Sequence, residues 1–194
     1  MKRLQILSLL LLISLLYLPD VSMDHLFGQD SSNPSLHALK YRSIGPTRYS
    51  GRIVDFAVSH QDTYLFYVAT ASGGLWKTGN NGIRFTPVFD DQPVISIGDI
   101  AIDPKNQEIL WVGTGESNNS RSCYWGDGIY KTLDGGKSWQ NMGLKDSHHI
   151  GRIVVDHEDS NVVYVAAMGH LYSRNSIRGV YKTLDGGKSW KRVL

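Results

Sequence analysis

Short apolar stretches alternate with polar turns along most of the chain, and this alternation repeats three times. Each repeat begins with two runs rich in β-branched and aromatic residues, separated by a polar turn. The three copies are DFAVSHQDTYLFYVAT from Asp55, DIAIDPKNQEILWVGT from Asp99 and RIVVDHEDSNVVYVAA from Arg152. Two such runs joined by a polar turn are typical of a β-hairpin. The pattern therefore predicts two paired strands at the start of each repeat.

A second block follows each hairpin and predicts two further strands. Its copies are GLWKTGNNGIRF at 74–85, GIYKTLDGGKSW at 128–139 and GVYKTLDGGKSW at 179–190. Four short strands in a unit of about 45 to 50 residues indicate one blade of a β-propeller, which typically has about 4 to 8 blades. We therefore expect an all-β fold, a β-propeller of four-stranded antiparallel blades, with units at about 53–90, 97–143 and 150–194 within residues 51–194.

The third unit reaches Leu194 inside its last expected strand. About three blades do not close a propeller ring. We therefore expect a C-terminally truncated fragment of a larger propeller. Its structural partners would be the remaining blades, C-terminal to Leu194.

The first 28 residues differ in composition from the rest of the chain. Lys2 and Arg3 precede an apolar run from Leu4 to Leu18, which is typical of a secretory signal peptide. A membrane anchor is the alternative, but the run is shorter than the roughly 20 residues that span a bilayer. We expect residues 1–28 to be a signal peptide and the mature chain, without a membrane span, to be secreted, periplasmic or at the cell surface. Residues 29–50 form a lead-in that could supply a closing strand.

The composition argues against several partners and cofactors. The chain has 194 residues and a formal net charge of +2, with basic and acidic side chains interspersed, so we expect no nucleic-acid partner. Cys123 is the only cysteine, which excludes an internal disulfide, and we expect a small buried side chain rather than a reactive thiol. The sequence has no serine-hydrolase elbow, phosphate loop or paired-cysteine motif, and His148 and His149 lack a third ligand at metal spacing. We therefore expect neither a cofactor nor a metal.

The turn between the third and fourth expected strands resembles a known motif. Thr-x-Asp-x-Gly-x-Ser-Trp occurs at 132–139 and 183–190, and the segment at 78–85 keeps its frame with Asn80 for aspartate and Phe85 for tryptophan. These copies resemble the Asp-box, or BNR repeat, of sialidase-like and sortilin-like propellers. The resemblance implies a structural turn on the face away from the binding site. Its residues here are Thr132, Asp134, Gly136, Trp139, Thr183, Asp185, Gly187 and Trp190.

The chemistry of this motif is that of a turn. An aspartate side chain accepts hydrogen bonds from nearby backbone N–H groups, and glycine adopts positive φ at little steric cost. A catalytic carboxylate or a calcium loop is the alternative. However, the Asp-x-Gly spacing lacks the run of oxygen ligands that a calcium loop needs.

Longer strings resemble a group of large exported proteins. YRSIGPTRYSGRIVDFAV, ASGGLWKT, SIGDIAIDP and VGTGESNN are similar to the N-terminal part of exported bacterial proteins that carry sortilin-type propellers and are labelled glycosyl hydrolases. The resemblance covers residues 41–194. It implies the fold more than the function, because one propeller fold hosts many activities.

Loops of unequal length are candidates for a binding site. The aromatic residues of the second and third expected strands are 9, 19 and 17 residues apart in the three units, so the extra length falls in one loop. These loops, and the segments leading into the first strands, lie at the blade end away from the turns. The ligand-binding candidates there are Arg52, Glu116, Arg121, Trp125, His149, Arg152 and His170. An ordinary solvated loop is the alternative.

Carboxylates and aromatic rings on one loop suit a peptide or carbohydrate ligand. The first functional hypothesis is therefore a sortilin-like binding module. The alternative is a glycoside hydrolase of the sialidase or xyloglucanase type, with Glu116, Asp99 and Asp127 as candidate catalytic carboxylates. Such an enzyme needs two carboxylates about 5 to 9.5 Å apart. The second would lie on blades beyond Leu194, so we expect this chain alone to be inactive. An assembly factor without a small ligand is a third hypothesis.

Overall fold

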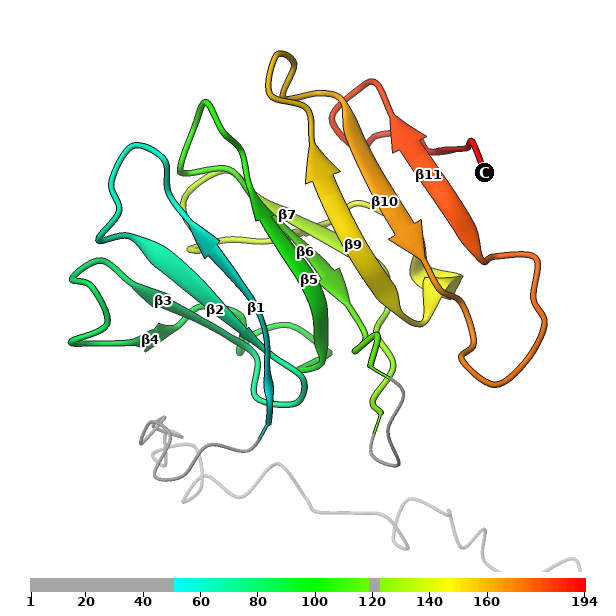
Figure 1. Ribbon diagram of the computed structural model, residues 1–194, viewed down its shortest axis with the longest axis horizontal. Coiled ribbons are helices and arrows are strands. Elements are labelled where there is room, and N and C mark those ends of the chain that lie inside the picture. Colours follow the sequence, from blue (N-terminus) through cyan, green and yellow to red (C-terminus); the bar gives the residue numbers. More distant parts are fainter. Residues whose placement is uncertain (1–50, 119–122) are drawn as a thin grey trace, which may run out of the picture. The chain divides into compact units, whose positions relative to one another are not determined.

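Each sheet of the protein is a four-stranded antiparallel meander. The computed structural model describes residues 51–118 and 123–194, and within these ranges twelve strands form three sheets (Figure 1). The prediction of an all-β fold made of four-stranded antiparallel blades is confirmed. The expected signal peptide, the lead-in at 29–50 and Arg121 lie outside the described residues.

The strands of each sheet follow one another in chain order. Sheet 1 consists of β1 (Ile53–Val58), β2 (Phe66–Thr70), β3 (Leu75–Thr78) and β4 (Thr86–Pro87). Sheet 2 consists of β5 (Ile97–Ile102), β6 (Leu110–Thr114), β7 (Ile129–Thr132) and β8 (Gln140–Asn141). Sheet 3 consists of β9 (Ile150–Val155), β10 (Val163–Ala167), β11 (Gly179–Thr183) and β12 (Lys191–Arg192). A short 3-10 helix, η2 (Lys145–Ser147), precedes β9.

The strand register repeats from sheet to sheet. A β-bulge interrupts each first strand near its start, between Ile53 and Asp55 in β1 and between Ile97 and Asp99 in β5, and opposite Ala166 and Ala167 in β9. The bulges leave equivalent residues at one register position. These are Asp55, Asp99 and Arg152, opposite Ala69, Gly113 and Ala166.

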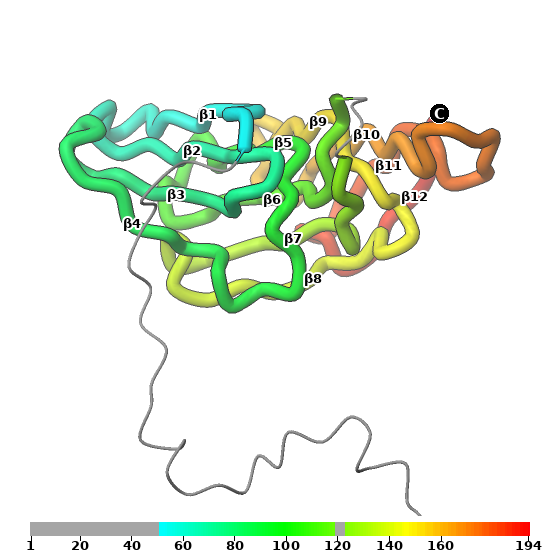
Figure 2. Tube along the Cα trace, turned by 90° about the horizontal axis from the view of Figure 1, so that it is seen from below, coloured from blue at the N-terminus to red at the C-terminus, as the bar shows by residue number. Residues whose placement is uncertain are grey.

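The first strands β1, β5 and β9 lie side by side, and the fourth strands lie at the other edge of the sheets (Figures 1 and 2). Two buried clusters hold neighbouring sheets together. Tyr67, Phe89 and Leu110 belong to the cluster between sheets 1 and 2, and Trp111 and Ile150 belong to the cluster between sheets 2 and 3. Burial of these apolar side chains supplies the main stabilisation between sheets.

Close backbone approach also joins sheets 2 and 3. A Cβ atom placed on Gly98 would overlap the carbonyl oxygens of Ile150 and Gly115. Only glycine leaves room for this contact. The start of β5 therefore packs directly on the chain that enters β9.

Candidate functional site

The predicted turn residues form a closed hydrogen-bond network at the β7–β8 turn. The Thr132 hydroxyl donates to Asp134 Oδ1 at 2.7 Å and accepts from Gly136 N–H at 3.0 Å. Asp134 Oδ1 also accepts from the N–H groups of Lys137 and Ser138, both at 2.9 Å, and Oδ2 accepts from the Ser138 hydroxyl at 2.6 Å. These hydrogen bonds hold the pKa of Asp134 well below its usual range, and the bond from the Ser138 hydroxyl has the largest effect. The carboxylate stays ionised as a turn acceptor and is poorly suited to proton transfer.

The other two turns repeat the network. Thr183 Oγ1 bonds to Asp185 Oδ1 at 2.7 Å, and the Ser189 hydroxyl and N–H bond to the same carboxylate, whose pKa is likewise held low. At the β3–β4 turn Asn80 Oδ1 takes the place of the carboxylate oxygen and accepts from the Thr78 hydroxyl at 3.0 Å. The degraded copy thus keeps the bonding pattern with a neutral acceptor.

At the other end of the sheets, an ion pair joins the segment before β1 to the segment after β6. The Arg52 guanidinium pairs with Glu116 Oε1. Glu116 is 1% exposed, whereas the Arg52 side chain is 54% exposed. The Glu116 N–H donates to Ser96 Oγ at 3.0 Å, which fixes the backbone beside β5. A buried carboxylate is thus held by one arginine that still faces solvent.

His149 lies against the backbone of Glu116. Its Nδ1 is 2.7 Å from the Glu116 carbonyl oxygen. Burial first, and then the His148 and His170 rings, lower the pKa of His149. Because a carbonyl oxygen can only accept, His149 Nδ1 carries the proton and donates to the loop that carries Glu116.

Three aromatic side chains from three segments stack beside His149. The His148 and His170 ring centroids are 3.7 Å apart at an interplanar angle of 36°, and the Trp125 ring meets His148 edge-on at 5.7 Å. His148 has φ 54°, a left-handed conformation that L residues rarely adopt. The stack therefore joins the β6–β7 loop, the segment before β9 and the loop after β10 into one surface.

A cavity of about 430 Å³ lies beside Trp125. Its wall is mainly apolar and aromatic, and Ser96 Oγ inside it donates to the Tyr124 carbonyl at 3.0 Å. Trp125 is 69% exposed. Cys123 also lines the cavity and is partly exposed, so the expectation of a buried thiol was wrong. The lining residues are Pro93, Val94, Ile95, Ser96, Cys123, Tyr124 and Trp125.

The remaining predicted carboxylates are engaged elsewhere. Asp127 Oδ2 accepts from the Tyr130 hydroxyl at 2.8 Å. Asp99 accepts from Ile153 N–H at 2.6 Å, and Arg152 Nη1 lies 3.4 Å from its Oδ1. Burial raises the pKa of Asp99 to about 6. Neither carboxylate forms a hydrogen bond or an ion pair with Glu116 within the described residues.

The structure thus brings Arg52 and His149 each into direct contact with Glu116, and it places Trp125 and His170 against the neighbouring His148. The pair of Arg152 and Asp99 is a separate contact along the first strands. The sequence reasoning did not select His148, Ser96 or Tyr124 as ligand-binding residues. The adjacent histidines were the one available signal for His148, and as metal ligands they were rejected for want of a third ligand at metal spacing. Among the described residues, no group of three His, Cys, Asp or Glu side chains could hold a metal ion.

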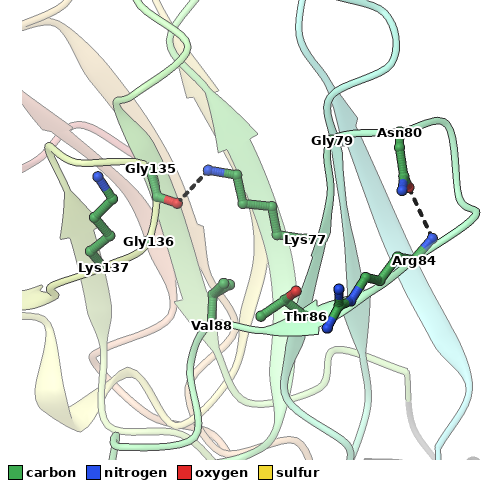
Figure 3. A pocket seen from close by; sticks show the side chains of 9 residues that line it. All are labelled: Lys77, Gly79, Asn80, Arg84, Thr86, Val88, Gly135, Gly136 and Lys137. Carbon is green, nitrogen blue, oxygen red and sulfur yellow. Dashed lines mark hydrogen bonds between the residues drawn. The ribbon is translucent and has the colours of Figure 1, made fainter.

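A second cavity, of about 360 Å³, lies between the β3–β4 and β7–β8 turns (Figure 3). Three cationic side chains, Lys77, Arg84 and Lys137, contribute to its lining. Figure 3 shows the Lys77 ammonium directed at the Gly135 carbonyl, 2.9 Å away. This cavity marks the junction between sheets 1 and 2 on the turn side.

Within residues 51–118 and 123–194, no helix is long and apolar enough to cross a membrane.

The chain matches no protein-family model and no curated protein sequence. It is similar to solved structures of much longer chains. An ancestral GH74 enzyme is 23% identical with a TM-score of 0.54, over 73% of this chain and 18% of that one. The GH74 xyloglucanase from Xanthomonas campestris is 20% identical with a TM-score of 0.54, over 73% and 23%. YCF48 bound to D1 peptide is 15% identical with a TM-score of 0.51, over 74% and 39%. The likeness shows the β-propeller fold. The chain spans between about a fifth and two fifths of the lengths of these proteins.

Proposed function

We propose that the chain is an exported β-propeller module of the Asp-box, sortilin-like kind, which binds a peptide or glycan at the end of the sheets opposite the turns. The observation that carries the proposal is the exposed Trp125 between the 430 Å³ cavity and the histidine stack. Aromatic surfaces beside a cavity with few polar groups are typical of ligand sites, and tryptophan and arginine are frequent binding hot spots.

The site offers two kinds of contact to a ligand. Trp125 and Tyr124, 69% and 55% exposed, present flat apolar faces on which a sugar ring or an apolar side chain could pack. Arg52 is half exposed and carries donors toward the same end of the sheets. Its charge is partly neutralised by Glu116, so we expect a neutral or mildly anionic ligand rather than a polyanion.

The xyloglucanase and the peptide-bound YCF48 among the structural neighbours are compatible with either ligand class. Glycan and peptide panels therefore form two arms of one binding experiment with the whole chain. We expect binding in one arm, weakened at least about tenfold by Trp125→Ala. Tyr64→Ala is the matched control, because Tyr64 is a similarly exposed aromatic residue (60%) on the β1–β2 turn. Absence of binding in both arms, or equal loss from Trp125→Ala and Tyr64→Ala, overturns the proposal.

A glycoside hydrolase is the second candidate, and the buried Glu116 carboxylate favours it. Burial in a ligand-facing site is one way in which enzymes prepare a catalytic acid. The mechanism needs a second carboxylate on the other side of the bond, and Asp99 and Asp127 are held by other partners. We therefore propose that the chain alone releases no reducing sugar. Release that is abolished by Glu116→Gln would instead establish the enzyme.

A further inference from the structure

The cavity between the β3–β4 and β7–β8 turns has three cationic side chains in its wall, and the described residues of the wall include no carboxylate (Figure 3). Lys77 comes from β3, Arg84 from the β3–β4 turn and Lys137 from the β7–β8 turn. Within residues 51–118 and 123–194, none of the three forms an ion pair. Unpaired cations that share one small space attract an anion, because their charges add there.

Two acceptors in the wall are already bonded, whereas donors remain. The Gly135 carbonyl accepts from Lys77 at 2.9 Å and from the Tyr67 hydroxyl at 3.1 Å. Asn80 Oδ1 accepts the backbone N–H of Arg84 at 2.9 Å, which identifies the other amide atom, Nδ2, as a donor. An ammonium has three N–H donors and a guanidinium has five. A group that only accepts hydrogen bonds, such as an oxyanion, therefore matches this wall.

The β3–β4 turn differs from the other two turns at the positions that set its charge. Asn80 stands where they have aspartate, and Arg84 stands where they have serine. In the β7–β8 turn this aspartate and serine satisfy one another, since Asp134 Oδ2 accepts from the Ser138 hydroxyl at 2.6 Å. Asn80 keeps the acceptor that the turn needs. The two differences thus remove a negative charge and add a positive one without a benefit to the turn itself.

The junction between sheets 2 and 3 provides a comparison within the chain. Lys131 and Lys188 occupy the positions of the two lysines, and Lys188 lies near enough to contribute to the lowered pKa of Lys131, after burial and against Asp103. The position of Arg84 is held by Ser138 there, and Asp134 adds a carboxylate. Only the first junction therefore combines three cations with a neutral turn.

Two carboxylates lie near the cavity without lining it. Burial raises the pKa of the Tyr67 hydroxyl, and the charges of Glu108 and Asp134 raise it further. Asp134 is held by its own turn, and a Cβ atom on Gly135 would lie 2.5 Å from Glu108 Oε2. These charges moderate the positive potential of the cavity. We therefore expect a single anionic group there rather than a polyanion.

We propose that this cavity binds one oxyanion group, a carboxylate, phosphate or sulfate, that is carried by a small ligand. The Arg84 guanidinium supplies a planar fork of donors that matches such a group, and Lys77 and Lys137 supply compact charges. The volume of about 360 Å³ is within the usual range for small-molecule sites, so it has room for more than the anionic group. Val88 offers an apolar contact to the remainder of the ligand. The site is separate from the one at Trp125 and can be tested without it.

Titration of the 194-residue chain with sodium phosphate, sodium sulfate and sodium glucuronate tests the proposal. Sodium chloride keeps the ionic strength constant in the three arms, because salt screens exposed charges. NMR spectra of the backbone amides should show saturable shifts confined to residues 79–88 and 135–137 in at least one arm. The arm that saturates at the lowest concentration identifies the anionic group. Arg84→Ser, which installs the serine of the other turns, should weaken this binding at least about tenfold.

Arg174→Ser is the matched control, because it removes the same charge from an exposed arginine that does not line the cavity. It should change the dissociation constant by no more than about twofold. Neutral glucose is the control ligand for glucuronate and should cause no saturable shift. The proposal is overturned by the absence of saturation in all three arms, by equal weakening from Arg84→Ser and Arg174→Ser, or by equal shifts with glucose and glucuronate.

Discussion

Asp99 on β5 accepts a hydrogen bond from the backbone N–H of Ile153 on β9, with an Oδ2–N distance of 2.6 Å. Asp55 makes the same contact one sheet earlier, with the N–H of Ile100 at 3.1 Å. A carboxylate at one register position thus joins the first strand of each sheet to the first strand of the next. Sheet 3 has Arg152 at this position, and Arg152 turns back to Asp99.

Asp99→Asn should alter the pH dependence of stability. Burial raises the pKa of Asp99 in the folded protein to about 6, above its ordinary value of 3.8. Between these values the folded state binds more protons than the unfolded state, so the contribution of Asp99 to the free energy of unfolding falls as the pH rises from about 4 to 6. Asparagine keeps an acceptor for Ile153 and carries no charge. We therefore expect the free energy of unfolding of Asp99→Asn, measured with urea at pH 7, to equal that of the wild type or to exceed it by up to about 1 to 2 kcal/mol.

A second variant, Asp99→Leu, distinguishes the effect of the charge on stability from the effect of the hydrogen bond with Ile153. Leucine also removes the acceptor, so it should lower the free energy of unfolding at every pH. If the free energy of unfolding of Asp99→Asn changes with pH in parallel with that of the wild type from pH 4 to 7, the Asp99 carboxylate does not titrate in this range, and the prediction is wrong.

Gly187→Ala should destabilise the junction between sheets 2 and 3. The new Cβ would lie 2.7 Å from Trp111 Cη2, and Gly187 has φ +96°, which L residues rarely adopt. We expect a loss of about 2 to 4 kcal/mol in the free energy of unfolding. Gly79→Ala is the control, because no atom lies within 4 Å of its added Cβ, and it should change stability by about 0.5 kcal/mol or less. Equal losses from the two substitutions would refute the steric explanation.

The turn network gives a third prediction, at Thr132. The Thr132 hydroxyl is buried, accepts the Gly136 N–H and donates to Asp134. Thr132→Val keeps the shape of the side chain but leaves the Gly136 N–H without this acceptor, so we expect a loss of about 1 to 3 kcal/mol in thermal or urea unfolding. Thr132→Ser retains the hydroxyl and should lose less than Thr132→Val. The reverse order would mean that packing of the methyl group, not the hydrogen bonds, decides stability here.

The strands and the turns could be predicted because both depend on local sequence. Alternation of apolar residues marked each hairpin, and a spacing of two residues from Tyr130 to Thr132 recurs in all three units. The register position shared by Asp55, Asp99 and Arg152 also followed from aligning the repeats. These features are set by residues near one another in the chain.

The surface around Glu116 could be predicted only as a set of candidates. The contact of Arg52 with Glu116 joins residues of two sheets that are far apart in the sequence. The stack of His148 on His170 forms with a positive φ at His148. In a sequence, a glycine is the usual sign of a positive φ, and position 148 is a histidine. Loops of unequal length have no repeat partner to align with. Their three-dimensional arrangement is therefore not encoded in the repeat pattern.

The Arg52 and Glu116 pair supplies the last prediction. Because Glu116 is buried and Arg52 is half exposed, removal of the arginine leaves a carboxylate without its cation in a poorly solvated site. We expect Arg52→Ala to lower the free energy of unfolding by about 1 to 3 kcal/mol, less than for a fully buried pair. In a double-mutant cycle by urea unfolding, the pair Arg52→Ala and Glu116→Gln should recover most of that loss, because the uncompensated charge is gone. Arg84→Ala, at an exposed arginine on the turn side, is the control and should change stability by about 0.5 kcal/mol or less. If the two substitutions are additive, the ion pair does not hold the loop of Glu116 in place, and the position of that loop would then depend on His149 and Ser96 alone.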